Sequence, residues 1–259
     1  MRAKNLALPL AAALVMTAAL PIRAEAVPVI AAAADLNFAM TEIVAAFQAE
    51  TGNRVEVTFG STGNFATQIR QGAPFQMFMA ADESYVIALQ DEGFTRDAGR
   101  LYAQGRIVIM VPHGAPLVAD GGLDSLKAAL EAGTITHFAI ANPAHAPYGV
   151  RAMEALQHKG IWEAVLPHLV LGENVSQAAQ FATSGDTQGG IIAYSLALAE
   201  EVSSLGTYAL IPADWHQPLN QRMVLLKNAG PVAEAFYAYV NAAAARAIMT
   251  KYGFTLPAD

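Results

Sequence analysis

Four short segments of the sequence place small, polar or hydroxyl residues at a predicted helix start, an arrangement that can bind an anion. The segments are ADL (34–36), GSTGN (60–64), NPAHAPYG (142–149) and ENVSQ (173–177). A helix N-terminus presents unpaired backbone N–H groups and a partial positive charge, and glycine or a hydroxyl lets an oxyanion approach closely. Since Ser, Thr, Asn and Asp cap helices in most proteins, each segment taken alone is better explained by capping.

Other chemistry finds weaker support in the sequence. Ser61 would be the natural nucleophile of a hydrolase, yet GSTG is not G-x-S-x-G and no histidine is tied to Ser61 by pattern. The segment SGDTQGG (184–190) lacks the lysine of a phosphate-binding P-loop. The six histidines show no metal-ligand spacing and no cysteine accompanies them, so loop or surface roles are expected, with His145 facing solvent.

The elements that would position these segments alternate along the chain. Apolar runs of strand length, such as VEVTF (55–59) and RIVIMVP (106–112), are separated by segments with helical spacing. Gly52 is expected to end the first helix and Asp82 to start another. This order predicts an α/β fold with mostly parallel sheets, in which ligands bind at the carboxyl ends of the strands.

The chain is long enough for two lobes, and no repeat or polar linker divides it. Any two lobes must therefore be joined by crossing strands, which we expect near 106–112 and 211–222. The predicted first lobe is discontinuous, with residues 27–108 and 218–259, and residues 109–217 form the second lobe.

The N-terminus reads as a secretory signal peptide cleaved after Ala26. Arg2 and Lys4 precede an uncharged apolar run that is short for a membrane anchor, and the frame Ala24-Glu25-Ala26 follows it. The net charge of −7 at pH 7 becomes more negative once this leader is removed, which argues against nucleic acid as a partner. Without cysteine, the exported chain depends on its core for stability.

Nearly the whole chain after the leader resembles the periplasmic molybdate-binding component of an ABC importer. The matching stretches are AAAADLNFAM (31–40), FGSTGNFATQIRQGAPFQMFMAADE (59–83), AIANPAHAPYG (139–149), ENVSQAAQFATSGDTQGGIIAY (173–194) and YGFTLP (252–257). The resemblance implies a two-lobed periplasmic solute-binding protein of type II, whose lobes close on the ligand by a hinge.

The resemblance also implies a site for a tetrahedral dianion, bound by neutral donors and without catalysis. Carried over by position, the molybdate-binding residues are Asp35, Ser61, Thr62, Tyr148 and Val175, the last through its backbone. Molybdenum is held only as its oxyanion through these residues, with no cofactor. Some members add a tyrosine where this chain has Ala193, so a role for Tyr194 is left open.

Asp35 is unusual because it is an acceptor where many relatives carry a donor. The favoured interpretation is that its carboxylate turns away and caps its own helix. In a second interpretation it is protonated in the closed site and donates to the ligand, with a raised pKa. In a third it accepts a proton from a ligand such as hydrogen phosphate.

We therefore expect an exported, monomeric protein that captures molybdate, and tungstate also, for an inner-membrane ABC permease. The alternatives are a receptor for sulfate or phosphate and, with less support, an exported hydrolase that uses Ser61.

Overall fold

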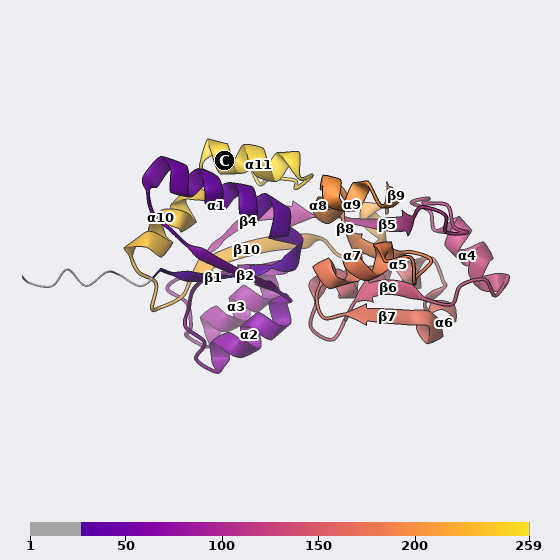
Figure 1. The fold of residues 1–259 in the computed structure, drawn as a ribbon. Coiled ribbons are helices and arrows are strands. Elements are labelled where there is room, and N and C mark those ends of the chain that lie inside the picture. The colour runs from indigo at the N-terminus through magenta and orange to yellow at the C-terminus, as the bar shows by residue number, and fades with distance from the viewer. Residues whose placement is uncertain (1–26, 259) are drawn as a thin grey trace, which may run out of the picture.

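The computed structural model describes residues 27–258, so the predicted signal peptide lies outside the described residues. Within this range the chain forms two lobes, each built around a five-stranded sheet that is packed with helices (Figure 1). The predicted α/β architecture of two lobes is confirmed.

The first lobe has separate apolar cores on the two faces of its sheet. The strand order is β2 (Glu56–Gly60), β1 (Val29–Ala33), β3 (Phe75–Ala80), β10 (Leu219–Leu225) and β4 (Arg100–Gly105). The helices are the 3₁₀ turn η1 (Ala34–Leu36), α1 (Asn37–Thr51), α2 (Thr62–Arg70), α3 (Glu83–Asp91), α10 (Pro231–Tyr239) and α11 (Ala243–Lys251). Helices α1, α10 and α11 bury Phe47, Phe236 and Met249 on one face, while α2 and α3 bury Phe65 and Leu89 on the other (Figure 1).

The second lobe is the middle part of the chain. Its strand order is β7 (Leu169–Gly172), β6 (Phe138–Ala141), β8 (Gly190–Ala193), β5 (Ile107–Pro112) and β9 (Gly206–Leu210). Its helices are α4 (Asp124–Glu131), α5 (Pro147–His158), α6 (Trp162–Val165), η2 (Leu166–His168), α7 (Val175–Thr183), α8 (Tyr194–Ala197), α9 (Glu200–Ser203) and η3 (Ala213–Trp215). The apolar core of this lobe is continuous with Ala33, Ala34 and Ala81 of the first lobe, so the two lobes are packed together.

Each sheet has four strands in one direction and one strand against them. In the first sheet β1 pairs parallel with β2 and β3, and β10 pairs antiparallel with β3 and β4. In the second sheet β6 pairs parallel with β7 and β8, and β5 pairs antiparallel with β8 and β9. Most strands are therefore parallel in direction, and the two reversed strands are the ones that follow a crossing between lobes.

The chain crosses between the lobes at two places. It leaves the first sheet after Gly105 and enters the second at Ile107, so Ile107 and Val108 pair in the second sheet although the sequence placed them at the end of the first lobe. It returns between β9 and β10, through the 3₁₀ turn η3. These two connections form the hinge-side link between the lobes (Figure 1).

The ends of two helices agree with the sequence. Helix α1 ends at Gly52, whose φ of 71° is favourable only for glycine. Helix α3 begins after Asp82, whose carboxylate accepts a hydrogen bond from the backbone N–H of Ser84. In the part of the chain that the structure describes, no helix is both long and apolar enough to span a bilayer.

Candidate functional site

The four predicted helix starts meet at one cavity between the lobes. Helices α2, α5 and α7 and the turn η1 each follow a strand, and each contributes its first residues to the cavity wall. The lining residues are Ala33, Ala34, Asp35, Gly60, Ser61, Thr62, Ala81, Ala146, Pro147, Tyr148 and Val175. All five sequence-predicted site residues are among them, and the wall includes no Lys or Arg side chain. The cavity volume is about 10 Å³, close to what one water molecule requires.

Asp35 does not cap a helix, so the favoured interpretation of its side chain is wrong. Neither η1 nor α1 has a side-chain cap, and the carboxylate points instead to Tyr148 of the other lobe and to Gln221 of β10. Its Oδ2 accepts hydrogen bonds from Tyr148 Oη at 3.0 Å and from Gln221 Nε2 at 2.6 Å. Its Oδ1 is buried and has no hydrogen-bond partner.

Burial gives this carboxyl an unusual proton affinity. Burial raises the pKa of Asp35 from 3.8 to about 6, although the hydrogen bonds from Gln221 and Tyr148 lower it in part. The same burial, together with the nearby Asp35 charge, raises the pKa of Tyr148 well above its usual value, which keeps the phenol a donor. The raised pKa agrees with the second interpretation of Asp35, that of a protonated donor.

Gln221 and Gly105 complete this cluster, and the sequence analysis missed both. Gln221 lies in β10, is fully buried, and also donates to Tyr148 Oη at 3.2 Å. A Cβ at Gly105, the last residue of β4, would lie 2.2 Å from Tyr148 Oη, so the phenol fits only because this residue is glycine. The alternation in β10 was the available signal, since it points Gln221 inward together with Leu219 and Met223.

Ser61 is tied to a histidine of the other lobe, in contrast to what its sequence pattern indicated. Ser61 Oγ lies 2.9 Å from His145 Nδ1, and it also accepts a hydrogen bond from the backbone N–H of Asn64. Either atom can donate in the Ser61–His145 contact, because a hydroxyl and an imidazole nitrogen can each donate or accept. His145 Nε2 then faces Glu173 at 3.6 Å. The expectation that His145 faces solvent is therefore wrong; its side chain joins the two lobes.

The remaining predicted residues occupy opposite walls of the cavity. Thr62 Oγ1 accepts a hydrogen bond from Ala81 N at 3.0 Å, which leaves the hydroxyl proton available to a ligand. Val175 is the first residue of α7, where the backbone N–H groups lack intrahelical partners. Tyr194, whose role was left open, is not part of the cavity wall and lies against Tyr208.

Comparison with known proteins identifies the family of the chain. The profile of the bacterial extracellular solute-binding protein family matches residues 28–255. The chain belongs to this family. It is 38% identical to the molybdate-binding protein ModA of Rhodobacter capsulatus over 94% of both chains, and 34% identical to that of Azotobacter vinelandii over 88% of this chain and 89% of the other. The solved periplasmic molybdate-binding protein of Azotobacter vinelandii superposes with a TM-score of 0.78 at 27% identity, covering 90% of this chain and all of the other. The resemblance seen in the sequence and the predicted fold class are thereby confirmed.

In this solute-binding protein the lobes are in direct contact, as expected for a closed state. Next to the cavity, Gly63 N donates to His145 O at 2.9 Å, and Ser176 Oγ donates to Ala34 O at 2.8 Å. Deeper in the interface, Ser195 Oγ donates to the backbone oxygen of Asp35.

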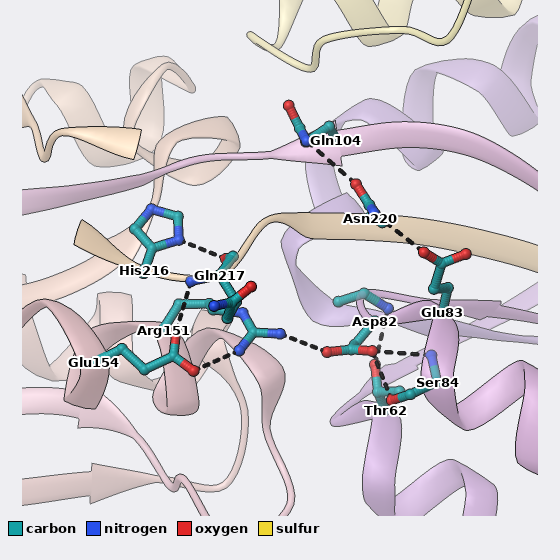
Figure 2. A network of polar contacts seen from close by, with 11 residues as sticks. Thr62, Asp82, Glu83, Ser84, Gln104, Arg151, Glu154, His216, Gln217 and Asn220 are labelled. Carbon is teal, nitrogen blue, oxygen red and sulfur yellow. Dashed lines mark hydrogen bonds and ion pairs between the residues drawn. The ribbon is translucent and has the colours of Figure 1, made fainter. Parts of the chain in front are cut away.

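A second group of contacts closes the lobes farther from the cavity. Arg151 of α5 donates to Asp82 of the first lobe and to Glu154 of its own helix, both at 2.7 Å (Figure 2). Glu154 in turn accepts from the backbone N–H of Gln217, in the segment that returns to the first lobe. The Arg151 side chain is only 10% exposed, so this ion pair is well shielded from water. We name the contact of Arg151 with Asp82 the rim latch.

Proposed function

We propose that this chain binds molybdate, and tungstate also, between its lobes and delivers it to an ABC permease in the inner membrane. The observation that carries the proposal is the convergence of four helix N-termini on one interlobe cavity whose wall includes no Lys or Arg. Neutral donors of this kind suit an oxyanion that is fully deprotonated at neutral pH. The names of the relatives, which are molybdate-binding proteins at 38% and 34% identity, support the choice of oxyanion.

The proposed donors come from both lobes. The hydroxyl and the backbone N–H of Thr62 face the ligand from the first lobe, and Tyr148 and the backbone of Val175 face it from the second. Asp35 and Ser61 complete the wall. The molybdenum atom is bound only through its oxygens.

The cavity must widen to admit the ligand. A volume of about 10 Å³ suits one water molecule, whereas a tetrahedral oxyanion carries four oxygens. The lobes therefore open for capture. When they close on the ligand, the Tyr148 hydroxyl donates to a ligand oxygen in place of Asp35. The direct contacts between lobes describe the closed limit of this motion.

We propose a periplasmic location after cleavage of the signal peptide near Ala26, a monomeric state, no cofactor, no nucleic-acid partner and no catalytic activity. An assay of ester hydrolysis tests the last point, because the Ser61–His145 contact would then have to act on a substrate.

A thermal-shift panel of oxyanions tests the function. A ligand present at 1,000 times its dissociation constant stabilises the folded state by about 4 kcal/mol. We expect molybdate and tungstate to raise the melting temperature of the mature protein, and chloride and nitrate to leave it unchanged. A shift produced by phosphate or sulfate but not by molybdate would contradict the assignment.

A further inference from the structure

The Asp35 carboxyl group has one oxygen in use and one without a partner. Gln221 and Tyr148 both donate to Oδ2, and Oδ1 is buried without any partner. The Gln221 contact comes from the same lobe as Asp35, so it does not depend on lobe closure as the Tyr148 contact does. A buried oxygen without a donor is rare in folded proteins and commonly marks a functional position. Because Asp35 lines the cavity, its unpartnered oxygen is the atom available to a bound ligand.

The groups around Asp35 supply no positive charge. The titratable neighbours that act on it are two tyrosines, Tyr148 on α5 and Tyr102 on β4. Gln221 on β10 is uncharged, and from α7 and α8 the groups nearest this turn are the hydroxyls of Ser176 and Ser195. The pKa of Asp35 responds to burial and hydrogen bonds only, with no contribution from a Lys, Arg or His among the residues described.

An ionised Asp35 would therefore face a bound dianion at close range with no compensating cation. Two like charges in a water-poor site repel strongly. A proton between the Asp35 carboxylate and the ligand oxygen removes this repulsion, because the two groups then form a charge-assisted hydrogen bond. Burial has already moved the pKa of Asp35 to about 6 in the free protein, and the charge of a bound dianion raises it further, so the complex holds the proton.

We propose that Asp35 and the bound oxyanion share one proton, located between Asp35 Oδ1 and a ligand oxygen while Gln221 holds Oδ2. This inference rests on the proposed oxyanion function. It identifies Asp35 as the residue that couples capture to pH, with Gln221 as its positioning residue. No covalent bond to the ligand centre forms or breaks; one proton leaves the solvent and enters the site with each dianion.

Oxyanions differ in whether they must take up this proton when they bind. Molybdate, tungstate and sulfate carry no proton at pH 8, so each takes one proton from solvent when it binds. Hydrogen phosphate brings its own proton and would bind without net uptake. Above the pKa of free Asp35, the affinity for molybdate should fall tenfold for each unit of pH, because the protonated fraction falls at that rate.

Calorimetric titration of molybdate into the mature protein at pH 8, in buffers of different ionisation enthalpy, measures the protons taken up. We expect one proton per molybdate for the wild type and none for Asp35→Asn, whose affinity should be independent of pH between 7 and 9. Asp186→Asn, at an exposed position in the loop before β8, is the matched control and should keep the uptake of one proton.

Each outcome bears on a distinct claim. Tight binding by the wild type without proton uptake would overturn proton sharing and leave the molybdate function intact. Equal proton uptake in Asp35→Asn would show that another group takes the proton, and would also overturn it. Should Asp35→Asn not fold, the pH dependence of wild-type affinity decides, since a flat profile from pH 7 to 9 contradicts the proposal. Failure of the wild type to bind molybdate at any pH from 5 to 8 would overturn the proposed function and proton sharing together.

Discussion

Gly63 should control lobe closure without affecting the fold of its own lobe. It lies in the first turn of α2, its N–H donates to His145 O in the other lobe at 2.9 Å, and a Cβ at this position would lie 2.7 Å from that same oxygen. Real Cβ contacts essentially never fall below 3.0 Å. The added Cβ would meet the backbone oxygen of His145, which cannot rotate away as a side chain can. The substitution Gly63→Ala therefore forces the two lobes apart at this contact.

The cost falls on the closed state alone. Overpacking of this kind costs about 1–3 kcal/mol, which corresponds to a loss of affinity of about five- to 150-fold. Within the helix, alanine is preferred over glycine by up to about 1 kcal/mol, so the lobe itself should fold at least as well. Binding and stability are thus expected to change in opposite directions.

Calorimetric titration with molybdate and thermal unfolding without ligand test this prediction together. Gln68→Ala, at an exposed position on the same helix, is the control for helix propensity and should bind as the wild type does. If Gly63→Ala kept wild-type affinity, the contact between Gly63 and His145 would not belong to the ligand-bound state. The closed arrangement described above would then be refuted as the binding conformation.

Three further predictions concern other contacts of the site. Removing one hydrogen bond to a charged ligand costs about 1.5–3 kcal/mol, so Thr62→Val and Tyr148→Phe should each weaken molybdate binding roughly tenfold or more. If calorimetric titration gave wild-type affinity for both variants, the ligand would bind elsewhere. Arg151→Met removes the rim latch, so stopped-flow measurements should show a faster rate of ligand release. The control Arg70→Met breaks an exposed ion pair with Glu92 and should leave that rate unchanged. Because burial raises the pKa of Asp35 from 3.8 to about 6, the contribution of this group to folding stability is complete below pH 4 and is lost as pH rises through 6, a change of about 3 kcal/mol. In denaturant unfolding, Asp35→Asn should lose this pH dependence. Parallel pH profiles of stability for the wild type and the variant would refute the assignment.

The parts of the site that arise from local sequence were predictable. A helix start depends on a few adjacent residues, so the segments that begin η1, α2, α5 and α7 were recognised from residue type and spacing, as were the Gly52 and Asp82 helix ends. The parallel order of β1, β2 and β3 follows from the alternation of strands and helices.

The contacts that set the chemistry were not predictable in the same way, because they join residues far apart in the chain. Gln221 reaches Asp35 across 186 positions, Tyr148 reaches it across 113, and His145 reaches Ser61 across 84. The capping interpretation of Asp35 relied on local preference, and the long-range donors outweigh it. Strand β4 was also missed, since its partner strand β10 follows more than a hundred residues later.

The most direct test of the central claim is the position of the bound metal. A crystal of the mature protein grown with molybdate, measured at the molybdenum absorption edge, reports each molybdenum atom through its anomalous signal. We expect one strong site between the lobes, within the ring formed by Asp35, Thr62, Tyr148 and Val175. A molybdenum site elsewhere on the protein, or none at a saturating concentration, would contradict it.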